Sequence, residues 1–532
     1  MKLHLPISIL VAATASVAYA GGPYVPQVIV PVEADTTLSV STSTEVEAAL
    51  TSNPKDETSP FYGTSSEQPK AVVKDGQGTL VIDKDITTYN PLVVREGTLT
   101  IQDATVKNYN KLDNGVCNIS VGGNNAHLVL DNASYIQSIN YASNYAGSMS
   151  IGSVDGKGSV TLTNGSTLHT DHFLFAGYST TNGHTNASQA TADSNTLYTA
   201  GEAGRSTINV ESGSSLSFSR SQFNNVDVNI TGEGSVMRDN ARTDGYNAVS
   251  WCYYGISSGS NAVKTVINIS DGGSFVSNHY NVFGYYDNNS AEINVSGKSN
   301  NGVASSINLA QYTYIGYNGN CTMNLTEGAE ANINEIGIST LSKVNVGIGS
   351  SINKIEGIAE GWISVNGGEL ENSGTISAYT QLNSGALIMN EGATSAYLQA
   401  LGGTLEITGD VTFTGDAELS NVDFIFANGV EIDLSGCDFT FTGGSITITL
   451  PDAVAMAYAA EADASQFGLV FKNAGTVSGL VGQEVTVQDA AGNTTTYTLT
   501  QDDVVVQAVP EPATATLSLL ALAALAARRR RA

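Results

Sequence analysis

A short alternating pattern decides the fold of this chain, and Ile267–Val276, which reads INISDGGSFV, is a clear copy of it. Asn268 lies between two isoleucines, a glycine pair follows, and small and apolar residues then alternate again. Because successive side chains of a strand point to opposite faces, both isoleucines face one side and the asparagine faces the other. The stretch therefore predicts a strand, a tight turn and a second strand. The apolar–Asn–apolar triplet recurs at residues 208–210, 228–230, 293–295, 307–309, 323–325 and 344–346.

A second element, an apolar residue followed by glycine and often tyrosine, precedes several of these triplets. It occurs at Phe175–Tyr178, Phe283–Tyr285 and Tyr314–Tyr317. The composite repeat returns every 20–32 residues or so, whereas a propeller needs regular blades of about 40–50 residues. A parallel β-helix tolerates unequal coils, because each coil needs only its strands in register with the next. We therefore predict an all-β chain folded as a right-handed parallel β-helix.

Proline marks the limits of this β-helix. None occurs between Pro91 and Pro451, although average usage of about 5% would place about 18 prolines there. Proline lacks a backbone N–H and is excluded from the interior of hydrogen-bonded ladders. We assign the β-helix to residues 71–450 and a proline-rich linker with an N-terminal cap to residues 21–70.

Both flanks are predicted to cap the β-helix, because open strand edges invite aggregation. Thr44 and Glu47 fit a capping box that begins a short helix over residues 44–52. Residues 451–508 are interpreted as a small C-terminal cap. They combine helical propensity at 452–467 with later alternating strands, one pair of which is joined around Ala491–Asn493.

The charge of the chain excludes one class of partner. Residues 21–508 hold 17 of the 22 basic residues and 49 of the 50 acidic ones, a net charge of −32. A body this acidic repels phosphate backbones and anionic lipid, so we expect no nucleic-acid binding. The acidity also keeps a repetitive β protein soluble.

Polysaccharide cleavage requires acidic clusters that this sequence does not display locally. A hydrolase needs two clustered carboxylates, and a lyase needs a Ca²⁺ site of several Asp residues beside a basic residue. Residues 92–450 contain no adjacent Asp pair, and their basic residues are scattered. We assign no catalytic residue. A site assembled across coils would leave no such local pattern, so a carbohydrate-active enzyme remains the alternative hypothesis.

The histidine and cysteine residues give no metal-site pattern. Alternation places His169 and Asp171 on one face and His172 on the other, with no fourth ligand nearby in sequence. We interpret this segment as a surface strand edge and expect neither metal nor cofactor. The cysteines are too far apart for a compact metal knuckle and are interpreted as single buried thiols. They are Cys117, Cys252, Cys321 and Cys437.

Tyrosine is unusually frequent and outnumbers phenylalanine 23 to 14. It gathers at Tyr253–Tyr254, Tyr285–Tyr286 and Tyr312–Tyr317. Such rings on successive coils could bind sugar faces or a protein partner, and Tyr285 and Tyr317 are the candidate ligand-binding residues. The alternative is an aromatic ladder packed along the β-helix.

The first 20 residues fit a secretory signal peptide. Lys2 provides the positive charge, Leu5–Val17 the apolar region, and Ala18 and Ala20 the small residues of a cleavage site. Cleavage by a signal peptidase after Ala20 would export the mature chain.

The last segment, residues 509–532, has three parts in order. Pro510, Glu511 and Pro512 precede an apolar run from Ala513 to Ala527. The four arginines at the end would stay on the cytoplasmic side, as the positive-inside rule requires. The apolar run is shorter than the roughly 20 residues of a comfortable span, so we expect only transient membrane anchoring. The arginines are Arg528, Arg529, Arg530 and Arg531.

These three parts together resemble the PEP-CTERM sorting signal of Gram-negative bacteria. The resemblance implies recognition by an exosortase, a membrane protease-transpeptidase, and processing close to Pro510–Pro512. It also implies delivery to the cell surface or extracellular matrix after a transient inner-membrane stage. The repetitive body is similar to the β-helical passengers of autotransporter and adhesin-like surface proteins, a resemblance that rests on its Gly- and Asn-rich alternation.

The leading hypothesis is therefore a non-enzymatic, exported surface or matrix protein with a structural or adhesive role. Surface glycans or matrix polysaccharide are the expected partners besides the two processing enzymes. The alternative is a β-helical carbohydrate-active enzyme or glycan-binding protein.

Overall fold

The computed structural model describes two compact units, Met1–Leu370 and Glu371–Ala532, which are treated separately here. The residues whose structure is described are 27–51, 71–109, 119–137, 149–152, 157–171, 173–177, 205–240, 251–256, 263–356, 361–450 and 469–508. Statements about absent features below concern these ranges.

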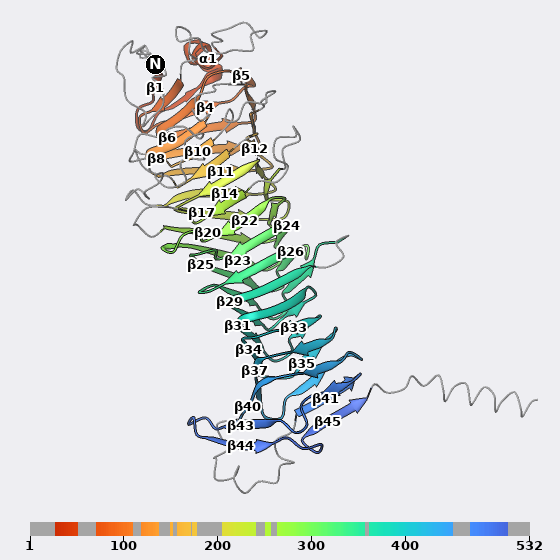
Figure 1. Cartoon of the computed structure of the whole chain (residues 1–532). Coiled ribbons are helices and arrows are strands. Elements are labelled where there is room, and N and C mark those ends of the chain that lie inside the picture. Colours follow the sequence, from red (N-terminus) through yellow and green to blue (C-terminus); the bar gives the residue numbers. More distant parts are fainter. Residues whose placement is uncertain are drawn as a thin grey trace, which may run out of the picture. The chain divides into compact units, whose positions relative to one another are not determined.

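The N-terminal unit is a parallel β-solenoid in which each complete coil contributes one strand to each of three ladders (Figure 1). Ladder A comprises β2 (Thr37–Ser39), β4 (Thr79–Ile82), the second halves of β6 (Leu92–Gln102) and β8 (Ile119–Asp131), β11 (Gly158–Thr163), β14 (Ser206–Glu211), β17 (Val226–Thr231), β20 (Val263–Ser270), β23 (Asn289–Ser296), β25 (Asn320–Thr326), β27 (Lys343–Val346) and the second half of β29 (Trp362–Asn372).

The other two ladders are built in the same way. Ladder B comprises β5 (Ile86–Thr88), β7 (Thr105–Asn108), β9 (Ser134–Gln137), β12 (Thr167–His169), β15 (Ser215–Phe218), β18 (Val236–Asp239), β21 (Ser274–Ser277), the first halves of β24 (Ser306–Ile315) and β26 (Glu330–Ser339), and β28 (Ser351–Lys354). Ladder C comprises β1 (Gln27–Pro31), β3 (Ala71–Asp75), the first halves of β6 and β8, β10 (Met149–Ile151), β13 (Phe173–Ala176), β16 (Arg220–Phe223), β19 (Trp251–Tyr254), β22 (Tyr280–Phe283), the second halves of β24 and β26, and the first half of β29.

The apolar residues of the repeat form the interior of the solenoid. In ladder A, Ile267 pairs with Ile293 and Ile269 with Val295 in the next coil, and all four side chains are fully buried. Strands β14 and β17 alternate buried and half-exposed residues throughout. Burying each such aliphatic side chain contributes about 1.5–3 kcal/mol, so the period-two pattern accounts for the core.

The asparagines of the same triplets face outward, and those on ladder A form a continuous row. Each side-chain amide donates to the side-chain oxygen of the preceding asparagine, at 2.6–3.0 Å. The coils differ in length, but each places one asparagine at the same position of the ladder. The members of the row are 20, 39, 26, 30 and 21 residues apart in sequence and yet lie in successive coils. Its members are Asn209, Asn229, Asn268, Asn294, Asn324 and Asn345.

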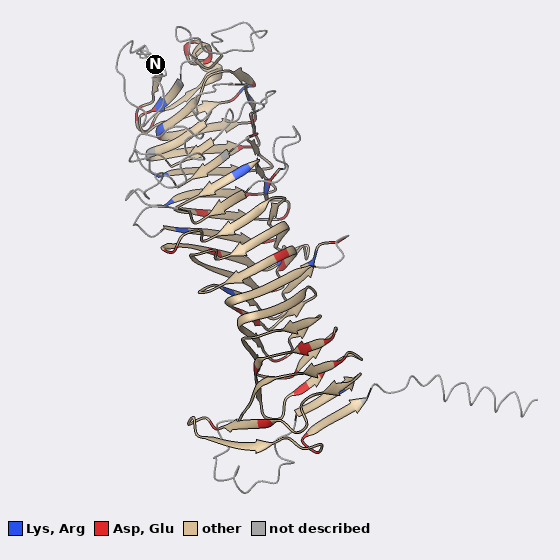
Figure 2. Cartoon of the chain, viewed as in Figure 1, with Lys and Arg blue, Asp and Glu red and all other residues tan. Residues whose placement is uncertain are grey.

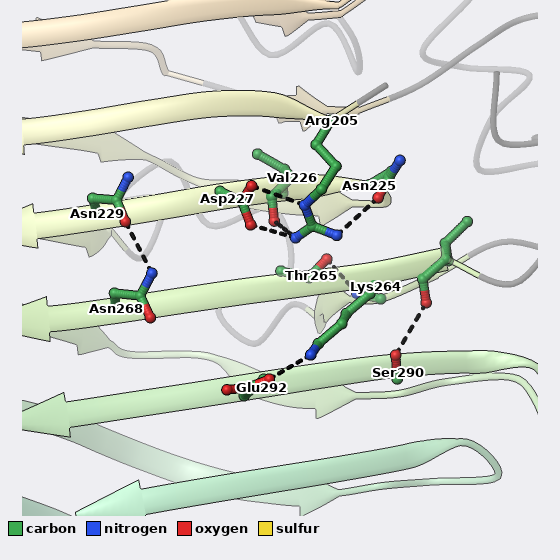
Figure 3. A network of polar contacts seen from close by, with 12 residues as sticks. Arg205, Asn225, Val226, Asp227, Asn229, Lys264, Thr265, Asn268, Ser290 and Glu292 are labelled. Carbon is green, nitrogen blue, oxygen red and sulfur yellow. Dashed lines mark hydrogen bonds and ion pairs between the residues drawn. The ribbon is translucent and has the colours of Figure 1, made fainter. Parts of the chain in front are cut away.

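Charged pairs occupy the same face beside this row (Figure 3). Arg205 donates from Nε to Asp227 at 2.8 Å and from Nη1 to Asn225 at 3.0 Å. Lys264 pairs with Glu292 across two adjacent coils. Charged residues are otherwise sparse on the described strands (Figure 2), and each of these pairs links two adjacent coils.

The corner between ladders A and B explains the Gly-containing turns. Two consecutive residues there have positive φ, as at Ser212 (53°) and Gly213 (75°), and again at Asp271 (52°) and Gly272 (82°). This left-handed pair turns the chain from ladder A into ladder B within two residues, which favours Asn, Asp and Gly.

A buried serine in each of several coils satisfies a backbone N–H of the preceding coil at this corner. Ser214 Oγ, for example, accepts from the Ser166 N–H at 3.1 Å, and both serines are fully buried. The same contact recurs for Ser235, Ser305 and Ser350, which accept from Gly213, Gly272 and Gly328 respectively.

A single short helix, α1 (Thr44–Thr51), follows the 3-10 turn η1 (Val40–Thr42) at the N-terminal end of the unit (Figure 1). It buries Val46 and Leu50, as expected for a cap. The predicted capping box is wrong in its first member: Ser43, not Thr44, accepts the Val46 N–H at 3.4 Å. Glu47 instead forms an ion pair with Lys84 at 2.5 Å.

The C-terminal unit has three ladders of the same kind. The first comprises the second half of β31 (Tyr379–Met389), β34 (Thr404–Ile407), β37 (Val422–Ala427), β40 (Gly444–Thr449) and β43 (Glu484–Gln488). The second comprises β30 (Thr375–Ile376), β32 (Thr394–Ser395), β35 (Val411–Phe413), β38 (Glu431–Asp433), β41 (Leu469–Ala474) and β45 (Val504–Ala508). The third comprises the first half of β31, β33 (Leu398–Ala400), β36 (Ala417–Leu419), β39 (Phe439–Phe441) and β42 (Val477–Ser478).

The parallel β-helical fold class is confirmed, and parallel pairing extends beyond the range 71–450 at both ends. β1 pairs in register with β3, and β41 pairs in parallel with β38 and β45. Among the named strands, β44 (Thr494–Thr498) departs from parallel pairing. It forms an antiparallel hairpin with β43 around the turn predicted at Ala491–Asn493. The segments 1–20, 452–467 and 509–532 lie outside the described residues.

Candidate binding surface

Outward-facing aromatic rings gather on three consecutive coils of ladder C, on β19, β22 and the second half of β24. The parallel register sets Trp251 beside Tyr280, and Val282 beside both Tyr253 and Tyr314. Two further rings, Tyr285 and Tyr317, follow β22 and β24 at the next corner. We call the following set the aromatic surface: Trp251, Tyr253, Tyr280, Tyr285, Tyr286, Tyr312, Tyr314 and Tyr317.

The rings hold one another in two stacks. Trp251 stacks on Tyr280 with ring centroids 4.8 Å apart and planes 25° apart, and lies 6.2 Å from Tyr314 at 21°. Tyr285 stacks on Tyr317 at 5.4 Å and 7°. The 4.8 and 5.4 Å distances join rings on adjacent coils and are close to the spacing of adjacent strands, about 4.8 Å, so the ladder sets these two contacts. Edge-to-face contacts join the stacks, including Tyr314 to Tyr317 at 5.0 Å and 85°.

Two rings of the aromatic surface are exposed to solvent, and the other six are half-buried. Trp251 is 41% exposed and Tyr317 is 44% exposed. Val282, beneath the rings, is only 1% exposed although alternation turns it outward. At one margin the Tyr312 side chain lies over Gly337. A Cβ added at Gly337 would lie only 2.3 Å from the Tyr312 hydroxyl oxygen, so the glycine makes room for this ring. The surface therefore consists of packed rings over an apolar floor, with open faces at Trp251 and Tyr317.

One basic and one acidic residue flank the aromatic surface. Burial raises the pKa of Tyr253 to about 12, and the neighbouring Arg220 charge opposes that rise. Burial likewise raises the pKa of Tyr312 to about 12, with the Glu335 carboxylate adding to it. Glu335 pairs in register with Tyr312, and its own pKa is raised by burial. Tyr253 and Tyr312 therefore carry neutral hydroxyls at physiological pH.

The structure brings the sequence candidates Tyr285 and Tyr317 together but gives them different environments. Tyr317 is an exposed end ring, whereas Tyr285 is half-buried between Tyr253, Tyr286 and Tyr317. Tyr254, expected with the exposed group, points inward and stacks on Phe283 at 4.7 Å. Sequence reasoning missed Trp251 and Tyr280, which the strand alternation at WCYY and YNVF could have revealed.

The histidine segment forms a local polar contact. His169 Nε2 lies 2.7 Å from Asp171 Oδ1, and His169 Nδ1 lies 2.7 Å from Ser217 Oγ. The predicted common face of His169 and Asp171 is thus correct, and His172 lies outside the described residues. Over the part of the chain that the structure describes, no group of three or more His, Cys, Asp or Glu side chains could hold a metal ion.

A buried polar cluster lies inside the solenoid behind the aromatic surface. The Asp239 carboxylate accepts hydrogen bonds from Ser277 and from the Asn278 N–H, and Cys252 Sγ lies 3.7 Å from it. Burial raises the pKa of Asp239, and burial together with that carboxylate raises the pKa of the Cys252 thiol. Cys252 is fully buried and unpaired, as is Cys321, so both are structural thiols, whereas Cys437 is half-exposed and Cys117 is not described.

The predicted processing residues lie outside the described part of the chain. These are Ala18 and Ala20 at the signal-peptide end, and Pro510, Glu511, Pro512 and Arg528–Arg531 in the tail. Within the described residues, no helix is long and apolar enough to cross a membrane. The last described strand, β45, ends at Ala508.

Comparison with known proteins identifies the tail alone. No curated protein and no solved structure matches this chain. Residues 508–531 match the PEP-CTERM protein-sorting motif, directly after β45. The chain thus carries the sorting motif of an exported protein that an exosortase directs to the cell surface.

Proposed function

We propose that this protein is a non-enzymatic adhesive component of the cell surface or extracellular matrix. In this proposal a signal peptidase removes residues 1–20, and an exosortase processes the transiently anchored chain near Pro510–Pro512. The solenoid then displays the aromatic surface outside the cell.

The aromatic surface is the observation that carries the adhesive role. Trp and Tyr supply large contact areas at low conformational cost and are enriched where proteins bind partners. Here the rings are prearranged by stacking, with Trp251 41% and Tyr317 44% exposed. A monomeric soluble protein has little reason to leave such rings open, and an exported protein meets its partners at this face.

Attachment of cells that produce the full chain tests the proposal. The double variant Trp251→Ala, Tyr317→Ala should reduce attachment to matrix while surface display, measured by antibody binding to intact cells, stays unchanged. Tyr397→Ala is the matched control, because Tyr397 is a surface tyrosine of the other unit that pairs with Tyr379. Equal attachment by all variants would contradict the adhesive role.

The enzymatic alternative has its own readout. Purified protein incubated with a panel of plant and host glycans should release no products. Catalytic release of oligosaccharides would replace the adhesive proposal with a carbohydrate-active enzyme.

A further inference from the structure

We propose that the aromatic surface binds an uncharged polysaccharide chain, which lies across the three successive coils that contain strands β19, β22 and β24. This inference rests on the proposed adhesive function and specifies the chemical class of its ligand. Its basis is the shape of the ring array, the chemistry of its edges and the charge of the chain around it.

The ring array suits a chain-like ligand. Its members lie on three successive coils, with stacked neighbours 4.8 and 5.4 Å apart. A monosaccharide would cover one ring, whereas a strand that follows the ladder contacts one exposed ring in each stack. Trp251 and Tyr317 are the most exposed rings of the surface, so they are the positions against which the apolar faces of pyranose rings can pack.

The polar groups of the surface suit sugar hydroxyls. Tyrosine presents an apolar ring and a hydroxyl that donates and accepts, and burial keeps the hydroxyls of Tyr253 and Tyr312 protonated. A purely apolar partner would leave these hydroxyls unsatisfied. Because the rings already contact one another, binding immobilises few side chains.

Charge excludes the competing polymers. Residues 21–508 carry 17 basic and 49 acidic residues. A field of this sign repels anionic polysaccharides and a second copy of the chain. Arg220 and Glu335 flank the surface, and the exposed Asp287 directly follows Tyr286, so the surface offers no concentrated positive charge to an anionic strand. An uncharged strand meets no such penalty.

Affinity electrophoresis of the full mature chain tests this inference. Mixed-linkage β-glucan, glucomannan and dextran serve as uncharged probes, and polygalacturonate as the anionic one. At least one uncharged probe should retard the protein and polygalacturonate should not. Removing an open ring by Trp251→Ala or Tyr317→Ala should weaken retardation about tenfold, the upper range for one aromatic contact. Tyr397→Ala should have no effect.

Ionic strength supplies a second readout. Raising salt about tenfold should leave binding to an uncharged strand unchanged, because screening affects charged ligands. Retardation by polygalacturonate, or binding that salt abolishes, would overturn the inference. If no polysaccharide binds while Trp251→Ala, Tyr317→Ala still reduces cell attachment, the partner is a protein. The inference then fails and the adhesive function stands. Circular dichroism of each variant confirms that the solenoid remains folded.

Discussion

The asparagine row of ladder A should stabilise the N-terminal unit by an amount that depends on position in the row. Asn268 donates to Asn229 Oδ1 at 2.9 Å and accepts from Asn294 Nδ2 at 3.0 Å. Asn268→Ala removes both bonds. A net contribution of about 0.5–1.5 kcal/mol per hydrogen bond predicts a loss of about 1–3 kcal/mol in the free energy of unfolding.

Asn345 provides a matched control at the end of the same row. It donates to Asn324 Oδ1 at 2.6 Å, and its own Oδ1 accepts no hydrogen bond. Asn345→Ala should therefore lose one bond, about half the effect of Asn268→Ala. Both changes remove the same side chain from an outward strand position, so differences in strand propensity cancel.

Urea unfolding followed by tryptophan fluorescence measures the free energy of unfolding of the N-terminal unit, which contains the asparagine row. The chain has two tryptophans, Trp251 and Trp362, and both belong to the N-terminal unit. The double variant Asn229→Ala, Asn268→Ala should show coupling of about 0.5–1.5 kcal/mol, while pairing Asn268→Ala with Asn353→Ala of ladder B should be additive. Equal losses at Asn268 and Asn345, or no coupling between Asn229 and Asn268, would show that the hydrogen bonds of the asparagine row do not stabilise the unit in this way.

Three further outcomes are expected. Burial lowers the pKa of Lys74 from 10.5 to about 8, so the unfolded chain binds more protons between these values. The free energy of unfolding should rise there by up to about 1.4 kcal/mol per pH unit relative to Lys74→Met, and parallel pH curves for the two proteins would contradict this. Ser305→Ala should cost about 1–3 kcal/mol in thermal or urea unfolding, because it leaves the buried Gly272 N–H without an acceptor, whereas Ser212→Gly at the left-handed corner should cost nothing. Replacing Pro510, Glu511 and Pro512 with alanines should leave unprocessed protein in the inner-membrane fraction, detected by immunoblot, and normal surface display would show that the motif is dispensable.

Local pattern predicted most of the solenoid, because its information is short in range. Alternation around Asn268 identified the buried and exposed faces, and the Asp271–Gly272 pair identified the corner. The absence of proline marked hydrogen-bonded ladders. The helical cap was found one residue out of phase, since Ser43 and Thr44 are both competent caps and only the backbone conformation selects between them.

The aromatic surface was only partly predictable. Tyr285 and Tyr317 were predicted as candidates from the clustering of tyrosines. Alternation within WCYY and YNVF could have shown that Trp251 and Tyr280 face outward, but their contact depends on which coils become neighbours. Trp251 and Tyr280 are paired by the register of β19 with β22 across a variable corner. Coil lengths that range from 20 to 48 residues leave that register undetermined until the apolar columns align in space.

The sequence by itself determined that this chain forms parallel strands with an apolar interior, and that it carries a sorting motif at residues 508–531. These properties reside in period-two alternation, glycine corners and a short linear signal. Only the tertiary structure decided which tyrosines face outward, which rings stack and which ring faces stay open. Those properties arise between coils, where a strand spacing of about 4.8 Å brings together residues that are distant in sequence.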